Sequence, residues 1–526
     1  MGLSQLLESA SLPTLVITSA MFCFVVSRVV SGVAALMVPP KGVPAESVWW
    51  YIWRMKEKTS VLDVHRHLLE KFGPVYCTWL GTFQINVCDP AANKFFFQRT
   101  DLFVKQMAAN APKIPLVSRW LGTKSILMVE GDEWKRQSRL MKPAFGAETL
   151  RAVAPLFMES VDAYAKRYDT SGEASFFDLD VHQAMTKFTI DVLGLAAFGT
   201  EFKLMSDDPA PIAGLYEKLR AGINKPVAVM VNYASGCGLW DRLPLESNAE
   251  YRRDTDAFRG MLRDVVSAKR AVRREEDSKS HGLNETDVKK DLVHLMVEGE
   301  ESLTDEEFID NLAIFFLAGH DTTTTSLTMA ALLLAEHAAV QDKAREEVLA
   351  AIAASGVSAE AAASPKASVV NYEAQKNMPF LTNVLKETLR LFPPATSIPP
   401  RRALADCDIP LSDGSTVPVK KGARVTCAVY ASHVNPDNFE DPLAFNPSRF
   451  DDPVPPFAFV PFGGASRVCI GQHFSLMEQR IFLAEMLRRY TLLPLTSVQR
   501  AYDTFKGPSL LLQPDHAQVR FEKRLL

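Results

Sequence analysis

The stretch Phe462-Gly463-Gly464-Ala465-Ser466-Arg467-Val468-Cys469-Ile470-Gly471 decides the fold of this chain. It is a glycine-rich loop that carries one cysteine, and a helical pattern begins directly after it. A thiolate at Cys469 would lie at the N-terminus of that helix, where the dipole and free N–H groups favour negative charge. The small residues let a flat group approach the backbone, and Arg467 is placed to bind a carboxylate on that group. These features are typical of a cysteine-ligated haem, and a buried structural cysteine beside a turn is the alternative.

Composition narrows the class of protein. The chain has 526 residues and a formal net charge of −4, so its charge does not indicate a nucleic acid as partner. Its 7 cysteines are scattered, without a C-x-x-C pair or a zinc-like spacing. This pattern favours a reducing compartment over a disulfide framework.

The N-terminal region is strongly apolar from Leu12 to Val38 and is long enough to span a bilayer. A cleaved signal peptide is the alternative, but the residues before the apolar run include Glu8 and no lysine or arginine. Positive charges follow instead, at Arg28 and Lys41, which favours a cytosolic body. We therefore predict a membrane anchor at residues 1–38, a stiff Pro-rich hinge at 39–44 and a catalytic domain at 45–526.

A second informative stretch lies inside the long apolar helix predicted for residues 305–336. It runs Phe315-Phe316-Leu317-Ala318-Gly319-His320-Asp321-Thr322-Thr323-Thr324-Thr325, and its glycine and threonines are poor choices for a helix interior. Ala318 and Gly319 leave space beside a flat ligand, and Phe315 and Phe316 indicate an apolar pocket. Asp321 followed by Thr322 forms an acid–alcohol pair suited to proton delivery. The alternative is a buried helix whose polar residues face a neighbour.

Other patterns carry less information alone. Residues 75–88 predict a small hairpin, and residues 130–139 open a helix that contains Trp134. Glu387 and Arg390 lie on one face of a helix predicted for residues 380–391, where they can pair. Residues 391–401 are rich in proline and are expected to form a strand beside the site.

Taken together and in this order, the motifs resemble those of the cytochrome P-450 superfamily over roughly residues 40–520. The cysteine loop is similar to the family's F-x-x-G-x-R-x-C-x-G, from Phe462 to Gly471. The resemblance implies that Cys469 is the axial ligand of haem iron, that Arg467 binds a haem propionate and that Phe462 packs near the sulfur. Ala465 departs from the pattern, since the family usually has glycine there.

The resemblance also implies roles for residues on the two predicted helices. The string from Ala318 matches [A/G]-G-x-[D/E]-T-[T/S], so that Thr322 assists dioxygen activation and Asp321 belongs to the proton relay. The family's E-x-x-R and P-x-R-F patterns imply a structural cluster of Glu387, Arg390 and Arg449 that supports the cysteine loop. The side chains expected to line the substrate site are Phe315, Phe316, Ala318, Ala395 and Ile398.

The propionate-binding residues match the family only in part. Trp134 fits the first position of the family's W-x-x-x-R, but Ser138 stands at the arginine position. Arg139 is one residue further on, about 100° around the helix. Arg401 is a second expected propionate partner.

The resemblance implies a mainly α protein with small β-sheets, the cytochrome P-450 fold, preceded by an N-terminal transmembrane helix. It implies a monooxygenase that holds haem b (iron protoporphyrin IX) and inserts one atom of dioxygen into a lipophilic small molecule. No G-x-G-x-x-G or phosphate-loop pattern is present, so electrons are expected from a separate protein. NADPH–cytochrome P-450 reductase is the expected donor and cytochrome b5 a second one. The expected location is the endoplasmic reticulum membrane, single-pass, with the catalytic domain in the cytosol.

Two other functions fit a cysteine-ligated haem. A haem-thiolate isomerase or dehydratase needs no reductase, but the pair Asp321–Thr322 argues against it. A haem sensor without turnover is the other alternative, and the proton-delivery pair disfavours it too. Consumption of NADPH with substrate separates the monooxygenase from both.

Overall fold

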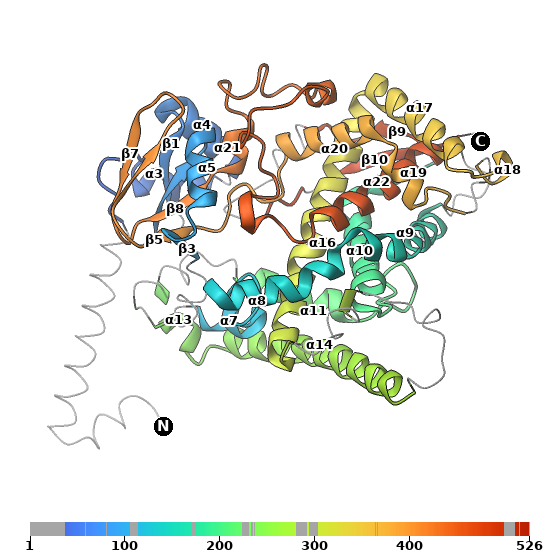
Figure 1. Cartoon of the computed structure of the whole chain (residues 1–526), viewed down its shortest axis with the longest axis horizontal. Coiled ribbons are helices and arrows are strands. Elements are labelled where there is room, and N and C mark those ends of the chain that lie inside the picture. Colours follow the sequence, from blue (N-terminus) through green and yellow to red (C-terminus); the bar gives the residue numbers. More distant parts are fainter. Residues whose placement is uncertain are drawn as a thin grey trace.

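The computed structural model describes residues 37–524 apart from several gaps: 58, 80–81, 106–113, 170–174, 224–230, 233–234, 236, 280–291, 294–302, 363, 365–366, 499–510 and 515. A sheet-rich part holds α3, α4 and α5, and a helical part surrounds the long helix α16 (Figure 1). The α-helices are α3 (Val48–Lys56), α4 (Val61–Phe72), α5 (Pro90–Gln98), α7 (Pro115–Leu121), α8 (Gly131–Met141), α9 (Ala147–Tyr168), α10 (Val181–Val192), α11 (Ile212–Ile223), α13 (Leu239–Arg242), α14 (Glu246–Lys279), α16 (Asp305–Glu336), α17 (Ala338–Ala354), α18 (Ala359–Ala362), α19 (Tyr372–Lys376), α20 (Pro379–Leu391), α21 (Val429–His433) and α22 (Gln472–Arg489).

Helix α16 is the centre of the helical part, and its bounds match the predicted helix. Its first turn is closed by a capping box, in which Thr304 and Glu307 satisfy each other's backbone N–H groups. Most of its side chains are buried, because α10, α14, α20 and α22 pack around it. A helix that is apolar on all sides is stable only inside a protein, so α16 fixes the neighbouring elements in place.

The largest sheet has the strand order β1-β2-β8-β5-β3. Strands β1 (Val75–Trp79) and β2 (Phe83–Val87) form the antiparallel hairpin predicted for residues 75–88, and β2 pairs in parallel with β8 (Arg424–Cys427). Strand β5 (Arg401–Ala403) lies between β8 and β3 (Phe103–Lys105), antiparallel to both. The smaller sheets comprise β4 (Phe176–Asp180), β10 (Gln518–Lys523) and β9 (Tyr490–Pro494), and β6 (Cys407–Pro410) with β7 (Thr416–Val419). The prediction of a mainly α protein with small sheets is confirmed.

One predicted strand is absent. Residues 395–400 are irregular, and the strand begins only at Arg401. Pro399 and Pro400 explain the difference, because a proline has no N–H to donate to a neighbouring strand.

The predicted anchor lies almost wholly outside the described residues, which begin at residue 37. Within the described part of the chain, no helix combines the length and the apolarity that crossing a bilayer requires. The Pro-rich segment 39–44 is irregular, and its end is fixed to the sheet: Val43 is buried and the Cys77 N–H donates to the Pro44 carbonyl at 2.8 Å.

Candidate active site

The cysteine loop is closed by a backbone hydrogen bond from the Cys469 N–H to the Phe462 carbonyl at 2.9 Å. Gly463 and Ala465 both have positive φ, 77° and 54°, which folds the chain back toward α22. Helix α22 then begins at Gln472 with Gly471 as its N-cap, as the sequence predicts. Ala465 therefore keeps the left-handed conformation in which glycine is favoured.

Cys469 is exposed as a residue, but protein atoms surround its thiol. Burial raises the pKa of this thiol, and hydrogen bonds from the backbone N–H groups of Gly471 and Gln472 oppose that rise. Both donors belong to the start of α22, where N–H groups have no partner within the helix. The net shift of the thiol pKa is upward, and the two N–H groups are the donors that would stabilise a thiolate once a metal is bound.

One face of α16 remains accessible within an otherwise buried helix. Ala318 is exposed and Thr322, one turn later, is half-buried, and the Thr322 hydroxyl donates to the Ala318 carbonyl at 2.8 Å. Phe315, one turn before Ala318, packs edge-on against Phe145. The predicted residues Phe315, Ala318 and Thr322 therefore share one face.

Helices α16 and α22 are held together by side-chain hydrogen bonds beside this face. The hydroxyls of Thr323 and Ser475 lie 2.8 Å apart, and the Ser326 hydroxyl donates to Gln479 Oε1 at 2.6 Å. Ser475 lies on the first turn of α22, a short distance along the chain from Cys469. These contacts fix the accessible face of α16 relative to the cysteine loop.

Asp321 lies on another face of α16 and is buried. Tyr216 of α11 donates its hydroxyl proton to Asp321 Oδ2 at 2.5 Å, and His320 Nε2 lies 3.1 Å from Oδ1. Burial raises the pKa of Asp321, but His320, the Tyr216 hydrogen bond and the charge of Arg220 lower it more, so that the net shift is downward. Burial and the charge of Asp321 raise the pKa of Tyr216, which therefore remains a donor.

Two sequence interpretations of α16 are wrong. Phe316 does not line the site: it is fully buried and packs against Phe198, Phe202, Tyr216, Phe258 and His320. Gly319 leaves space for a protein neighbour, because a Cβ there would come within 3.0 Å of Leu193 Cδ1. Both positions face protein neighbours of α16, and the sequence does not reveal this because α16 is apolar on nearly all sides.

Ala395 and Ile398 are both half-buried, as residues that line a substrate site can be. Ile398 lies against the cysteine loop, since its Cδ1 is 3.8 Å from the position that a Cβ on Gly463 would take. The Thr426 hydroxyl donates to the Ile398 carbonyl and thereby fixes this segment to β8.

Arg467 contacts the helix that carries Trp134. Its guanidinium lies over the Trp134 ring, 3.6 Å from the centroid, and donates to Glu130 Oε2 at 2.5 Å. The other terminal nitrogen, Nη1, is buried and has no hydrogen-bond partner among the described residues. The sequence placed Arg467 and Trp134 in one site, and the structure brings them together.

Arg401 and Lys105 complete a cluster of positive charge around Glu130. Arg401 is buried, stacks on Phe96 at 4.6 Å and is the register partner of Lys105 across β5 and β3. The Lys105 N–H donates to Glu130 Oε1 at 2.6 Å. Burial, with the charges of Arg467 and Arg401, lowers the pKa of Lys105 to about 7.

This cluster fits the acidic edge of a haem. It has cationic side chains from Lys105, Arg401 and Arg467 around one carboxylate, and the Arg467 Nη1 is a buried donor in need of an acceptor. Carboxylates on a bound group would satisfy both requirements. Sequence analysis missed Lys105, because only its pairing with Arg401 brings it here. Arg139 is exposed and Ser138 buried, so Arg139 does not replace the family's arginine.

Glu387, Arg390 and Arg449 form the predicted structural cluster. Arg390 and Glu387 are both fully buried and paired by two hydrogen bonds of 2.7 Å. The remaining donors of Arg390 bind the carbonyls of His433, Pro442 and Ala444, so that every N–H of the guanidinium has an acceptor. Arg449 Nε lies 3.4 Å from Glu387 and its terminal nitrogens bind the carbonyls of Glu440 and Asp441. The cluster thus fixes residues 433–449, ahead of the cysteine loop.

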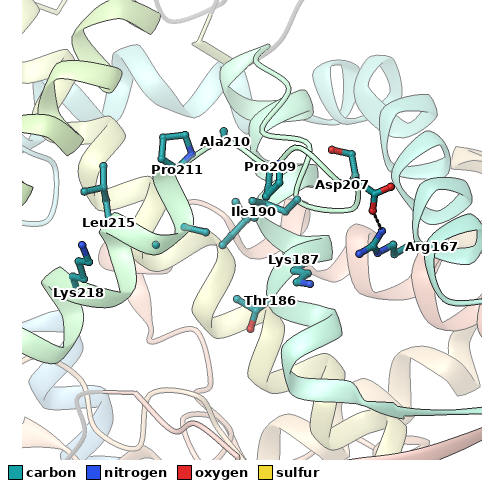
Figure 2. A pocket seen from close by; sticks show the side chains of 14 residues that line it. Arg167, Thr186, Lys187, Ile190, Asp207, Pro209, Ala210, Pro211, Leu215 and Lys218 are labelled. Carbon is teal, nitrogen blue, oxygen red and sulfur yellow. Dashed lines mark hydrogen bonds and ion pairs between the residues drawn. The ribbon is translucent and has the colours of Figure 1, made fainter.

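A separate pocket of about 640 Å³ lies between α10 and α11 (Figure 2). Its floor is apolar, with Ile190 and Leu215, and Lys187, Lys218 and the Arg167–Asp207 pair also line it. None of the residues predicted for the active site lines this pocket. It is therefore a surface feature distinct from the cysteine site.

Comparison with known proteins agrees with the geometry. The sequence model of the family "Cytochrome P450" matches residues 39–521. The chain is 27% identical to "Probable cytochrome P450 4s3" of Drosophila melanogaster, with 86% of this chain and 87% of the relative covered. It is 28% identical to "Echinocystic acid 23-monooxygenase" of Saponaria officinalis (87% and 83% covered). It is 26% identical to "Ultra-long-chain fatty acid omega-hydroxylase" of Homo sapiens (78% and 75%). The chain therefore belongs to the cytochrome P450 family and is a haem-iron monooxygenase of that family.

Proposed function

We propose that this monooxygenase hydroxylates a lipophilic carboxylic acid, using haem b and electrons from a separate NADPH-dependent reductase. The observation that carries the proposal is the accessible face of α16, with Ala318 and Thr322, fixed beside the cysteine loop by the Thr323–Ser475 and Ser326–Gln479 contacts. This arrangement supports the proposal, because the Thr322 hydroxyl would be available for proton delivery, and Ala318 would offer a small apolar side chain, on the side of a cysteine that can ligate iron.

Different residues of the chain would bind different parts of the haem. Cys469 would ligate the iron, with the N–H groups of Gly471 and Gln472 stabilising its negative charge. Arg467, Trp134 and Arg401 would hold the propionates. When bound, the haem supplies the activation of dioxygen and the transfer of one oxygen atom.

The proton path uses the two neighbouring residues of α16. The Thr322 hydroxyl, which donates to the Ala318 carbonyl, would hold a proton on the reaction side of the helix. Asp321 would replenish it from the buried side, where Tyr216 and His320 keep its carboxylate oriented. Without this supply, reducing equivalents would be lost as hydrogen peroxide.

The substrate class rests on two relatives and on the lining of the site. Their names refer to an ultra-long-chain fatty acid and to echinocystic acid, and both of these molecules are named as acids. Phe315, Ala318 and Ile398 offer apolar surface to such a body. A carboxylic acid with a long or broad hydrocarbon portion therefore fits better than a small polar molecule.

The electron donor and the cellular location that we propose are those expected for the family. Lys135, Arg139 and Lys142 are exposed along α8 and its end, and would attract an acidic electron-transfer protein such as NADPH–cytochrome P-450 reductase or cytochrome b5. An anchor at residues 1–38 would place the protein in the endoplasmic reticulum membrane, with the catalytic domain facing the cytosol.

A reconstitution experiment tests this function. The purified protein, a reductase and NADPH are incubated with fatty acids, triterpenoid acids and the methyl esters of both. We expect hydroxylated product that depends on NADPH, and weaker binding of the esters in the haem absorbance assay. Product without NADPH would favour an isomerase or dehydratase, and equal binding of acids and esters would contradict the acid preference.

A further inference from the structure

The pocket between α10 and α11 has the size of a small-molecule binding site (Figure 2). Its volume is about 640 Å³, and ligand pockets occupy about 300–1,000 Å³. Side chains of α10 and α11 form two of its walls, and residues between 204 and 211 form a third. No residue of the predicted active site lines it, so a ligand here would bind apart from the haem.

Hydrogen bonds hold the third wall in place. The buried Asp191 carboxylate of α10 accepts the N–H groups of Leu204 and Met205, at 2.8 and 2.9 Å. The Ala210 N–H donates to the Phe202 carbonyl at 2.9 Å and closes the loop between them. The wall is therefore formed before any ligand binds, which reduces the entropy lost on binding.

The floor of the pocket is apolar and recessed. Ile190 and Leu204 are only 1% and 6% exposed, and Leu215 of α11 is half-buried beside them. The next residue, Tyr216, turns inward and packs on Phe316 of α16, so the floor belongs to the outer side of α11. Hydrocarbon is the chemistry that such a floor binds best.

Most polar groups of the lining are already paired within the protein. The Thr186 hydroxyl donates to a backbone carbonyl one turn earlier at 2.9 Å, and the Ser206 hydroxyl donates to a backbone carbonyl three residues earlier at 2.8 Å. Arg167 of α9 pairs with Asp207 at the edge of the pocket (Figure 2). These groups place no demand on a ligand.

Two lysines of the lining are left over. The ammonium groups of Lys187 and Lys218 have no ion-pair partner among the described residues, and Glu217, beside Lys218 in sequence, is paired with another side chain. Each lysine lies about one helical turn from a floor residue, Lys187 before Ile190 and Lys218 after Leu215. In Figure 2, Ile190 appears between the two lysines. An apolar floor is thus flanked by unpaired positive charge.

We propose that this pocket binds a free amphipathic carboxylate, with its hydrocarbon chain on the apolar floor and its anionic end paired with Lys187 or Lys218. Three side chains of the lining are basic and one is acidic, although the whole chain has a net charge of −4, so an anion is attracted to this part of the surface. The occupant is a monomeric acid rather than a bilayer, because the apolar floor is recessed below exposed lysines. The inference does not depend on which substrate the haem site takes.

The test counts the decanoate molecules bound per haem in the full-length holoenzyme, by equilibrium dialysis below the micelle concentration. Gly214 lines the pocket and a Cβ there meets open space, so Gly214→Phe should fill the pocket and remove one bound decanoate. Gly260→Phe is the matched control, because Gly260 is also helical with open space at its Cβ but lies on α14, outside the pocket. It should leave the count unchanged, and decanoate titrations followed by haem absorbance should agree among all three proteins.

A second variant tests the charges. Lys187→Gln combined with Lys218→Gln should weaken this binding by about tenfold at low salt, and salt should weaken it in the parent, because exposed ion pairs are modest and screened. Lys166→Gln, at an exposed lysine of α9 outside the pocket, should change neither. Decanol, which has the chain without the charge, should bind more weakly than decanoate.

Chemical labelling locates the ligand. Decanoate should protect Lys187 or Lys218 from acetylation by acetic anhydride and leave Lys166 reactive. An unchanged decanoate count in a folded Gly214→Phe protein, equal affinity in the double lysine variant, or equal binding of decanol would each overturn the proposal. So would protection of these lysines by vesicles of anionic phospholipid but not by decanoate, which would make the pocket a membrane contact. If Gly214→Phe does not fold, the lysine variant and the labelling decide the question.

Discussion

The conformation of Ala465 leads to a prediction about stability. Its φ is 54°, a region in which an L-residue with a Cβ is strained by about 1–2 kcal/mol relative to glycine. Ala465→Gly removes that strain but also gives the unfolded chain more freedom, which costs about 0.4–1 kcal/mol. We expect the variant to be neutral or more stable, by at most about 1.5 kcal/mol.

Ser466→Gly is the matched control for Ala465→Gly. Ser466 is the next residue, is exposed and does not have positive φ, so glycine there brings only the entropic cost. The difference between the two variants cancels that cost and leaves the strain alone, about 1–2 kcal/mol.

The assay is thermal unfolding of the haem-loaded protein, followed by haem absorbance and circular dichroism at one heating rate. For a body of this size the entropy of unfolding is about 1 kcal/mol per kelvin, so 1 kcal/mol corresponds to only about 1 °C. The two variants should therefore differ by about 1–2 °C, with Ala465→Gly the higher. Equal midpoints, or a lower midpoint for Ala465→Gly at unchanged haem content, would refute the strain argument.

Four other predictions concern the ligand, the proton, the cation cluster and the anchor. Cys469→Ala should abolish the thiolate-type spectrum of the reduced carbon monoxide complex, and survival of that spectrum would mean that another residue is the ligand. Thr322→Ala should retain haem but divert NADPH to hydrogen peroxide, measured as peroxide per NADPH; unchanged coupling would contradict its role. The pKa of Lys105 is lowered to about 7 from 10.5, so the unfolded chain binds more protons between these values and the stability of the haem-free protein should rise with pH there. Lys105→Met should remove that rise, whereas Lys135→Met, at an exposed position, should not. Deletion of residues 1–38 should release a haem-loaded protein from membranes, and failure to bind haem would show that the segment belongs to the fold.

The sequence predicted those parts of the site that depend on local motifs. Cys469, Arg467 and the start of α22 are close in sequence, and the spacing of Glu387 and Arg390 places both on one helix face. It could not predict Lys105, because that residue reaches Glu130 only through the pairing of β3 with β5. Strand pairing between distant segments depends on the whole fold rather than on local spacing.

The wrong interpretation of Phe316 has a different cause. A helix that is apolar on every side gives no periodic signal for which face is accessible, so Phe315 and Phe316 look equivalent in sequence. The structure distinguishes them, because α10 and α14 cover one side of α16 and Tyr216 of α11 contacts Phe316 there. Tyr216 was missed for a related reason: it contacts Asp321 across 105 residues of sequence.

The geometry of α16 also separates the acid and the alcohol of the motif. Neighbouring helix residues differ in direction by about 100°, so Asp321 and Thr322 cannot share a face. The buried face gives Asp321 a fixed environment from Tyr216 and His320, while the accessible face leaves Thr322 beside Ala318. Under the proposed function, a proton held at Asp321 would have to pass from the buried face of α16 to the face that carries Thr322. If Asp321 has the proposed role, Tyr216 positions its carboxylate from α11, and substitution of Tyr216 should alter coupling before it alters haem binding.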